Sequence, residues 1–237
     1  MDKSKALKTH GGTNGYNWIS DFVYGGIDGA VTTFAVVAGV EGASLSTGII
    51  LILGFANLFA DGFSMAVGKY SSDKAELEEY DRIKQIEYKH LKEKPEHERD
   101  EVREIMERYG FKGKDLKRAV EVITSDDDAW VDLMMRNEFN MTQENINPIL
   151  GGFATFLSFI LIGFIPLMSY VFRDLIGGEN VFVLTCVLTS LALFVVGAVK
   201  SRFTVRNWIL CGLETAFIGG FAASIAYFIG AMLQGLI

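Results

Sequence analysis

Residues 47–91 read TGIILILGFANLFADGFSMAVGKYSSDKAELEEYDRIKQIEYKHL, an apolar stretch that passes directly into a highly charged one. The apolar part, residues 47–70, is long enough to cross about 30 Å of hydrocarbon, which takes about 20 residues. Neither glycine nor proline occurs between Gly68 and Pro95, so we expect one helix to continue to about Leu91. The stretch therefore predicts a membrane-spanning helix that extends into water.

The net charge of the chain is concentrated in one segment. The chain has 237 residues, of which 50% are apolar and 22% charged, and its formal net charge is −7. Residues 71–147 contain 21 of the 29 acidic and 14 of the 22 basic side chains, so this segment carries the whole net charge. Such segregation excludes a single soluble core, a basic nucleic-acid-binding protein and a disordered polymer. It indicates an integral membrane protein with an acidic soluble insert.

Five apolar stretches are long enough to span a bilayer. They cover residues 20–40, 47–70, 149–172, 181–199 and 208–236. We therefore expect an all-α, multi-pass membrane protein with an N-terminal tail and two spans in residues 1–70, a helical insert in 71–147, and three spans in 148–237. In the first span Gly25 and Gly29 form a G-x-x-x-G pair, a spacing that allows close helix contact but also occurs by chance.

Positively charged residues are distributed unevenly between the two sides of the predicted spans. One side has Lys3, Lys5, Lys8, Lys69, Lys74, Lys200, Arg202 and Arg206, whereas the loops on the other side have Arg173. Because short cytoplasmic loops are enriched in Lys and Arg, this bias of eight residues to one places the N-terminus and the insert in the cytoplasm. Five spans then leave the C-terminus on the far side. A prokaryotic cell membrane and a vacuolar membrane both fit this pattern.

The insert has the start and stop signals of several helices. After the long helix, a second helix begins at Pro95, because proline is tolerated in the first turn, and ends at Gly110. A third covers about residues 115–123, and a fourth begins at Ser125, which forms a capping box with Asp128. No segment shows the alternation typical of a strand. We therefore expect an all-helical insert.

Three acidic residues, Asp28, Asp61 and Glu214, lie within the predicted spans. A charged residue at the centre of a membrane helix costs about 2.5–3.5 kcal/mol on insertion scales, so each needs a compensating partner. Glu214 lies near the Arg206 end of its span, where a static ion pair or an interfacial position would be enough. Asp28 and Asp61 are therefore the stronger functional candidates.

Each of these two acids belongs to a polar row on one helix face. At about 100° per residue, Asp21 and Asp28 point within about 20° of each other, and Thr32 lies about 40° from Asp28. The second row consists of Asn57, Asp61 and Met65. Its members follow at intervals of four residues and cover about 80° of the helix surface. Carboxylate, amide and thioether groups on two neighbouring helices predict the lining of a cation path, although a static polar contact would use the same residues.

The insert carries candidate metal ligands at helical spacing. Glu87 and His90 are one turn apart, and so are Glu98 and Glu101. A further group consists of Met134, Met135 and Glu138. Carboxylate, imidazole and thioether together suit Fe²⁺ better than Mg²⁺ or Ca²⁺, which prefer oxygen ligands. Taken singly, the acidic pairs could be a solvated face and the methionines core residues.

Three motifs are similar to those of a known family. They are DGAVT at residues 28–32, DGFSM at 61–65, and WVDLMM at 130–135 followed by Glu138. With this order and spacing, the chain resembles the vacuolar iron transporter family over almost its whole length. The resemblance implies a membrane domain of five helices that dimerises around a metal path, together with a helical cytoplasmic metal-binding domain. It also implies exchange of divalent metal ions for protons.

The resemblance assigns residues to two sites. It implies that Asp28 and Met65 form the membrane site. It implies a second set of ligands that hold several metal ions between subunits, namely Glu87, Glu98, Glu101, Met134, Met135 and Glu138. These assignments agree with the groups that helical spacing brings together.

Three positions depart from the pattern of the family that the chain resembles. His90 and Asn57 stand where relatives carry Glu, and Lys69 stands where a small or acidic residue is frequent. The imidazole of His90 still supplies a metal ligand, but one that titrates near neutral pH. If the carboxylate missing at Asn57 carries protons in relatives, then Asp61 takes its place here or the proton coupling differs.

We therefore expect a proton-coupled transporter, not an enzyme, that moves Fe²⁺ or Mn²⁺ out of the cytosol for storage or detoxification. The expected partners are divalent metal ions, with Zn²⁺ and Co²⁺ as further candidates, protons, the lipid bilayer and a second copy of the chain. We expect no prosthetic group and no nucleic acid. The acidic insert would concentrate cations, and protons would compete with metal because metal ligands bind in their deprotonated form.

Three alternatives stay open on the sequence alone. Glu87 and His90 form one Glu-x-x-His unit, which is typical of di-iron carboxylate sites, but a membrane-tethered oxidase would need a second unit. The insert could also act as an iron-binding sensor or store without transport. A channel would use the same residues as an exchanger.

Overall fold

The structure is a computed structural model that describes residues 16–142, 146–177 and 180–236. All regular elements among these residues are helices, which confirms the predicted all-α class. The chain forms two compact units. We call them the membrane unit, which comprises the described residues within Met1–Ser72 and Asn147–Ile237, and the polar unit, which comprises those within Asp73–Ile146.

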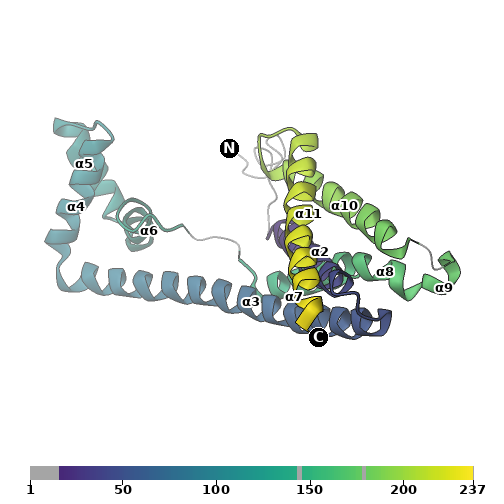
Figure 1. The fold of residues 1–237 in the computed structure, drawn as a ribbon. Helices are drawn as coiled ribbons and strands as arrows, with labels where there is room; N and C mark the ends of the chain where they lie inside the picture. The colour runs from purple at the N-terminus through teal and green to yellow at the C-terminus, as the bar shows by residue number, and fades with distance from the viewer. Residues whose placement is uncertain (1–15, 143–145, 178–179, 237) are drawn as a thin grey trace. The chain divides into compact units, whose positions relative to one another are not determined.

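Within the described residues, four helices are long and apolar enough to cross a membrane, and a bent pair of helices makes a fifth candidate. The described elements of the membrane unit are α2 (Trp18–Gly42), the first part of α3 (Thr47–Glu93), α7 (Pro148–Gly163), α8 (Ile165–Val171), α9 (Arg173–Ile176), α10 (Val181–Lys200), η1 (Ser201–Phe203), α11 (Trp208–Leu233) and η2 (Gln234–Leu236) (Figure 1). The prediction of a polytopic membrane protein is therefore confirmed.

The third predicted span, residues 149–172, is not one straight helix. It consists of α7 and α8, which are bent by 41° at a break after Gly163. Pro166 lies in the first turn of α8. Proline has no N–H to donate to the carbonyl four residues earlier, and its ring clashes with that carbonyl, so a helix breaks just before it. The predicted span therefore consists of two helices, and the break between them was not predicted from the sequence.

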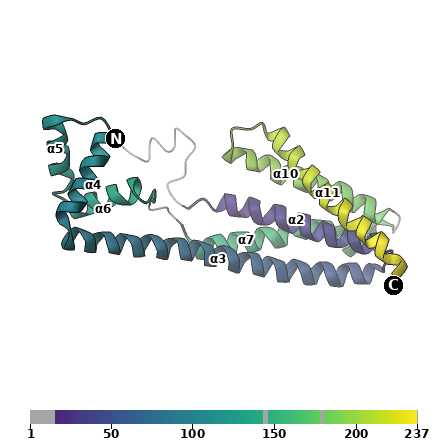
Figure 2. The ribbon, with the colours of Figure 1, turned by 60° about the vertical axis from the view of Figure 1, so that its left-hand side comes forward.

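Helix α2 is the best-packed helix of the membrane unit, and it lies against α7 and α11 (Figures 1 and 2). Small residues make this possible. A Cβ on Gly29 would lie 2.5 Å from the carbonyl oxygen of Phe159 in α7, and one on Gly25 would lie 2.5 Å from the carbonyl oxygen of Thr155. The G-x-x-x-G pair is therefore a real helix contact, in which backbone meets backbone.

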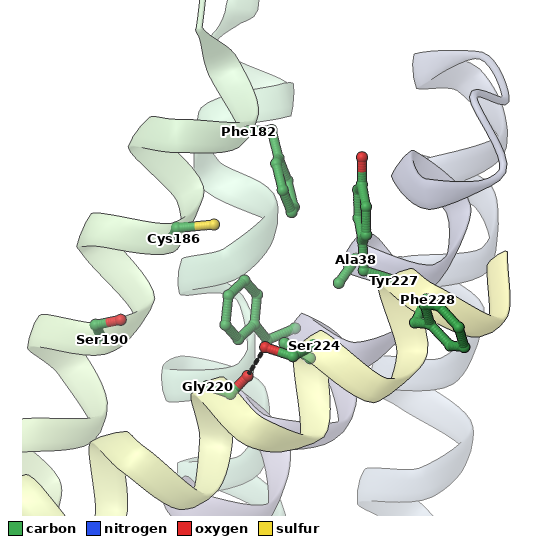
Figure 3. Close-up of a pocket in the computed structure, with 10 residues that line it drawn as sticks. Ala38, Phe182, Cys186, Ser190, Gly220, Ser224, Tyr227 and Phe228 are labelled. Carbon is green, nitrogen blue, oxygen red and sulfur yellow. Dashed lines mark hydrogen bonds between the residues drawn. The ribbon is translucent and has the colours of Figure 1, made fainter. Parts of the chain in front are cut away.

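A cavity of about 510 Å³ lies between α2, α10 and α11 (Figure 3). Its lining is mostly apolar, with the small polar side chains of Ser190 and Ser224 among aromatic rings. The hydroxyl of Ser224 donates to the carbonyl of Gly220 at 2.7 Å, one turn earlier on α11. None of the acids in the predicted cation path lines this cavity, so it is distinct from that path.

The polar unit is formed by the part of α3 from Asp73 onward, α4 (Pro95–Arg108), α5 (Gly113–Ile123) and α6 (Asp127–Asn137). Helix α3 runs without interruption to Glu93, which confirms the predicted continuous helix. Helix α4 begins at Pro95 and is followed by Gly110, whose φ of +94° is readily adopted only by glycine. Both boundaries agree with the predicted ones.

The predicted capping box at Ser125 was wrong. The N-cap of α6 is Asp126, whose carboxylate accepts hydrogen bonds from the backbone N–H groups of Asp128 and Ala129 at 2.9 and 3.1 Å. The Ser125 hydroxyl instead donates to the carbonyl of Val122 at the end of α5. An ionised carboxylate interacts more favourably with the positive end of a helix than a hydroxyl does, which explains the choice of Asp126.

The polar unit has its own hydrophobic core. Its buried members are Leu91, Val102, Ile105, Met106, Val120, Trp130, Val131, Met134 and Met135. They come from all four helices, so the core fixes α3, α4, α5 and α6 to one another within this unit. Two of the candidate metal ligands, Met134 and Met135, belong to this core.

Candidate metal centre

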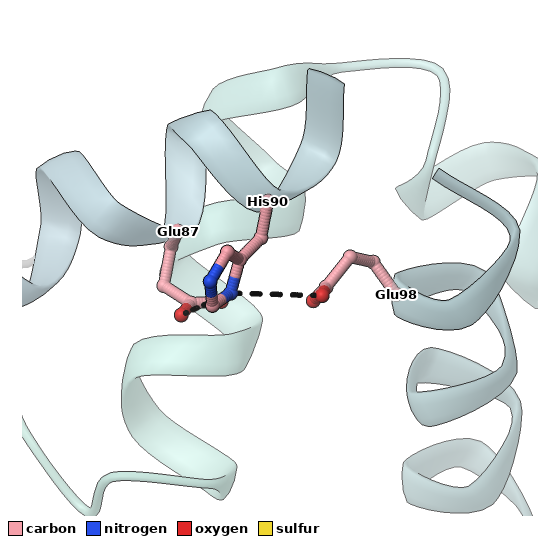
Figure 4. Close-up of side chains that lie close together, drawn as sticks. All are labelled: Glu87, His90 and Glu98. Carbon is pink, nitrogen blue, oxygen red and sulfur yellow. Dashed lines mark ion pairs between the residues drawn. The ribbon is translucent and has the colours of Figure 1, made fainter. Parts of the chain in front are cut away.

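Two pairs of candidate ligands meet at the corner between α3 and α4. Helix α3 presents Glu87 and His90 from its last two turns, and α4 presents Glu98 and Glu101 from its first two turns. Only Lys94 lies between the two helices, because Pro95 starts α4 immediately. Figure 4 shows the side chains of Glu87, His90 and Glu98 directed toward one another.

The distances in this cluster are those of a site that could hold a cation. The Nδ1 atom of His90 lies 3.5 Å from Oε1 of Glu87 and 3.7 Å from Oε1 of Glu98. One ligand atom from each of the three residues lies within 4.8 Å of the others. Atoms that bind one ion at about 2.1 Å are separated by about 3–4 Å, so small movements would complete the coordination.

The two carboxylates of this cluster are buried. Glu87 is 2% exposed and Glu98 4% exposed, and the Oε2 atom of each is buried without a hydrogen-bond partner. Burial, followed by repulsion from Glu101 and Glu87 and a hydrogen bond with Glu101, raises the pKa of Glu98 to about 7, while His90 acts in the opposite direction. A buried carboxylate oxygen without a hydrogen-bond partner is unfavourable, so a proton or a cation at these two oxygens would stabilise the site.

Glu138 also belongs to this centre. Burial and then the charges of Glu138 and Glu101 raise the pKa of Glu87, with His90 opposing them. Burial and then Glu101 raise the pKa of Glu138 itself. A cavity of about 150 Å³ is lined by Glu138 together with Glu87, His90 and Glu98. The carboxylates therefore act on one another as a group.

His97 is a candidate ligand that the sequence analysis missed. Its Nδ1 atom lies 3.3 Å from Oε1 of Glu101, and His97, Glu98 and Glu101 form a second group whose ligand atoms lie within 4.8 Å of one another. Glu98 is common to both groups. The spacing of four residues between His97 and Glu101 could have indicated this pair, since it places both on one helix face.

The two methionines are core residues of the polar unit. Met134 and Met135 are 0% and 1% exposed and belong to its hydrophobic cluster. Met134 also lines a cavity of about 290 Å³ together with Glu101 and Glu138. The structure thus brings the thioether of Met134 to the same cavity as two of the predicted carboxylates, while it gives Met135 a packing role in the core.

In the membrane unit, the five residues of the predicted path are all partly exposed: Asp28, Thr32, Asn57, Asp61 and Met65. The carboxylates of Asp28 and Asp61 are close enough to interact electrostatically. The Thr32 hydroxyl donates to the carbonyl of Asp28 at 2.8 Å, and the amide nitrogen of Asn57 is buried without a hydrogen-bond partner. The role of these residues as a path stays a prediction.

Two further charged residues of the membrane unit have ion-pair partners. Glu214 in α11 accepts a hydrogen bond from Arg206 at 3.0 Å, which is the static partner that the sequence left open. Lys69 in α3 lies 3.2 Å from Oδ1 of Asp21 in α2. Glu214 is therefore not assigned to the path.

An all-helical membrane unit with four or five candidate spans, combined with a polar unit that clusters carboxylates and imidazoles, defines a multi-pass membrane protein with a candidate metal centre. The model of the VIT family matches residues 19–231. The chain belongs to this family, as its three motifs predicted.

Several curated proteins are similar to the chain over most of its length. The vacuolar iron transporter of Toxoplasma gondii is 33% identical over 226 residues, which cover 92% of this chain and 75% of the relative. Vacuolar iron transporter 1 of Arabidopsis thaliana is 32% identical over 217 residues, covering 91% and 86%. The vacuolar iron transporter of Plasmodium berghei is 30% identical over 224 residues, covering 91% and 82%.

Proposed function

We propose that this protein is a transporter, not an enzyme, that moves Fe²⁺ or Mn²⁺ from the cytosol across a membrane in exchange for protons. Relatives named as vacuolar iron transporters support the substrate. The observation that carries the proposal is a pair of buried carboxylate oxygens, Glu87 Oε2 and Glu98 Oε2, that have no hydrogen-bond partner. The Oε1 atoms of the same two carboxylates lie 3.5 and 3.7 Å from Nδ1 of His90. A divalent cation would satisfy both Oε2 atoms at once.

In this proposal the polar unit captures the ion first. Its surplus of acids raises the local concentration of cations. Glu87, His90 and Glu98 offer two oxygens and a nitrogen, and Met134 offers a sulfur in the adjoining cavity. Nitrogen and sulfur ligands favour Fe²⁺ over the much more abundant Mg²⁺, which prefers oxygen ligands alone.

The ion then passes along the row of polar groups on α2 and α3. Asp28 and Asp61 supply the negative charge, and Met65 supplies a soft ligand of the kind found in the polar unit. Since these groups stay partly exposed in one copy, we propose that a second copy of the chain covers them and completes the path.

Protons and metal ions would compete for the same groups, because metal binding requires deprotonated carboxylates. In the polar unit, the raised pKa values of Glu87, Glu98 and Glu138 mean that these groups take up protons more readily than ordinary glutamates. We propose the same competition at Asp28 and Asp61, where a proton arriving from an acidic far side would release the metal ion. Mutually exclusive occupancy of one site then couples the two flows.

The proposed direction rests on the charge of the loops. Lys69, Lys74, Lys200, Arg202 and Arg206 lie on one side of the spans, and Arg173 lies on the other. Lys3, Lys5 and Lys8 belong to the first set but lie outside the described residues. The enrichment of basic residues supports a cytoplasmic polar unit and hence capture of metal from the cytosol.

Transport can be tested with purified protein in proteoliposomes, with Fe²⁺ outside and an acidic interior. We expect uptake by the wild type that disappears when the pH gradient is collapsed. Asp28→Asn should lower the flux at least about tenfold, because the isosteric amide cannot neutralise the ion. Glu214→Gln is the matched control, since this membrane-helix acid pairs with Arg206, and its flux should equal that of the wild type. Wild-type flux in Asp28→Asn would remove Asp28 from the path.

A membrane-tethered di-iron oxidase is the second candidate, because Glu87 and His90 form a Glu-x-x-His unit that the structure places beside Glu98. An oxidase consumes O₂ when Fe²⁺ is added, whereas a transporter does not. Oxygen consumption in step with added Fe²⁺ would favour the oxidase. A sensor or store would bind Fe²⁺ without consuming O₂ and without flux, and a channel would give flux that does not depend on a proton gradient.

A further inference from the structure

The ion pair between Lys69 and Asp21 is an unusual feature of the membrane unit. The Nζ atom of Lys69 lies 3.2 Å from Oδ1 of Asp21, and the hydroxyl of Tyr16 donates to Oδ2 of the same carboxylate. The side chain of Asp21 is 12% exposed and that of Lys69 27%. The pair is thus largely shielded from solvent, where an interaction between charges is stronger than on an open surface.

Lys69 continues the polar row of α3. It follows Met65 by four residues, as Met65 follows Asp61 and Asp61 follows Asn57. In the same way, Asp21 belongs to the polar row of α2, because it lies on the same helix face as Asp28. The ion pair therefore lies on the same two helix faces as the groups proposed to carry the ion.

The register of α2 and α3 places this pair at the end of the row. The two helices are joined by the short connection between Gly42 and Thr47, so they run antiparallel. Asp28 lies seven residues from Asp21, and Asp61 lies eight residues from Lys69. When Lys69 faces Asp21, Asp61 therefore comes level with Asp28, in agreement with their electrostatic interaction. An ion that enters from the polar-unit end of α3 meets Asp21 first.

A lysine at this position competes with entering ions. A shielded carboxylate needs a cation, and the ammonium group supplies one that is attached to the chain and cannot diffuse away. A monovalent ion that replaced the ammonium group would bring no more positive charge to Asp21, and its binding would break the ion pair between Lys69 and Asp21. A divalent ion interacts about twice as strongly with Asp21 and is drawn onward by Asp28 and Asp61.

We propose that the ammonium group of Lys69 acts as a tethered cation that competes with entering ions for Asp21. It excludes monovalent ions there and is displaced only by divalent ones; this inference rests on the proposed function. It is a specificity-determining residue, not a metal ligand. Its presence raises the metal concentration needed for half-maximal transport, in return for discrimination against K⁺ and Na⁺.

The test compares Lys69→Met, which removes the charge and keeps an unbranched apolar side chain, with Lys69→Arg, which keeps the charge. Mn²⁺ uptake into proteoliposomes is measured in KCl and in N-methylglucamine chloride at equal ionic strength, because the organic cation is too large to replace an ammonium group. For Lys69→Met we expect a KM for Mn²⁺ at least about threefold lower than that of the wild type in the organic salt, and a rise of similar size in KCl. Lys69→Arg and the wild type should show no difference between the salts.

A second measurement does not depend on transport. Mn²⁺ should raise the melting temperature of detergent-purified Lys69→Met more than that of the wild type, and the additional increase should disappear in Lys69→Met combined with Asp21→Asn. The polar unit contributes equally in all variants, so the difference reports Asp21. If the wild type transports no metal, the proposed function is wrong. The melting temperatures with Mn²⁺ still show whether Lys69 competes with metal for Asp21.

A purely structural ion pair would give a different result. Lys69→Met would then have a lower melting temperature, with the wild-type KM, no difference between the two salts and no additional stabilisation by Mn²⁺. That result would overturn the proposal.

Discussion

Glu98 is the residue on which the candidate metal centre depends most. It belongs to both groups of clustered ligands, it is almost fully buried, and one of its carboxylate oxygens has no hydrogen-bond partner. Its neighbours Glu87 and Glu101 are themselves acidic, so each raises the cost of a negative charge at Glu98. A bound divalent ion removes this cost for all three carboxylates at once, which gives the site its preference for double charge.

Replacing Glu98 should therefore weaken metal binding strongly. For Glu98→Gln we expect the Kd for Mn²⁺ to rise at least about tenfold, equivalent to about 1.4 kcal/mol, because the amide has the same shape but no charge. Isothermal titration calorimetry of the detergent-purified protein measures this. Glu121→Gln is the control, since Glu121 is an exposed acid of the same unit that pairs with Arg118. An unchanged Kd in Glu98→Gln would exclude Glu98 as a ligand.

The pKa of Glu98 also predicts how stability depends on pH. This pKa is about 7 in the folded protein, against an ordinary value of 4.5. Because the folded state holds the proton more tightly than the unfolded state, the free energy of unfolding of the metal-free protein should decrease as the pH rises from about 4.5 to about 7. Melting temperatures measured in the presence of a chelator should fall over this range, and Mn²⁺ should restore stability at the upper end.

Glu98→Gln provides the comparison for this experiment. Since glutamine does not titrate, the fall in melting temperature between about pH 5 and about pH 7.5 should be smaller in the variant than in the wild type. Equal falls in both proteins would show that Glu98 does not hold a proton in this range.

At this scale the sequence predicts which residues are candidates but not their environment. Spacing along a helix was enough to pair Glu87 with His90 and Glu98 with Glu101, because residues three or four apart share a face. It could not show that Glu98 of α4 lies beside His90 of α3, because that depends on how the chain turns at Pro95. The partner of Lys69 lies at a contact between two helices that only the folded chain reveals, whereas a static ion pair for Glu214 near Arg206 was already among the predicted alternatives.

Among the elements, α2 determines the packing of the membrane unit. Its glycines contribute to this packing because the backbone of α7 lies directly against them. In a bilayer, where apolar side chains gain little by leaving lipid, such close backbone contact is a main source of association between helices. Asp28 lies next to Gly29, so the same contact that holds α2 also positions the acidic row.

A methyl group at Gly29 should disturb this contact. The Cβ of Gly29→Ala would lie 2.5 Å from the Phe159 carbonyl oxygen, which is backbone and cannot move aside, so we expect a loss of about 1–3 kcal/mol and a lower melting temperature. Gly220→Ala is the matched control, because a Cβ there meets nothing within 4 Å in α11, and alanine favours a helix by about 0.5–1 kcal/mol. Equal melting temperatures for the two variants would contradict the packing described.

The number and type of elements follow from the sequence more closely than their boundaries. The long helix α3 was predictable because no glycine or proline interrupts its charged half. The break between α7 and α8 and the cap at Asp126 were missed, since a proline within an apolar run and three acids after a serine each allow more than one outcome. Tertiary packing decides between such outcomes, and a local sequence pattern carries no information about tertiary packing.

On the scale of the whole molecule, the two units have surfaces suited to different solvents. The membrane unit exposes large apolar side chains on α3, α10 and α11, as expected of surfaces that meet lipid, whereas the polar unit carries the net negative charge of the chain. The proposed function needs the polar unit to face the compartment from which metal is taken.

The topology can be measured with single cysteines. In a variant in which Cys186 and Cys211 are replaced by serine, we expect an impermeant maleimide to label Asp174→Cys in right-side-out vesicles. Glu121→Cys should be labelled only after the vesicles are opened. Both positions are exposed, so access depends on the membrane alone. Labelling of both from the same side would contradict five spans with a cytoplasmic polar unit.

The antiparallel register of α2 and α3 has a consequence for how such a chain can change during evolution. One residue added to or removed from a helix turns every later side chain by about 100° and moves it along the axis, so a single insertion within α2 after Asp21, or within α3 before Lys69, would separate lysine from aspartate and disperse the acidic row. Most exposed positions of these helices can change identity without such a shift. We therefore expect descendants of this gene to differ in the identity of many residues in α2 and α3, while natural selection eliminates almost every change in the length of these two helix segments.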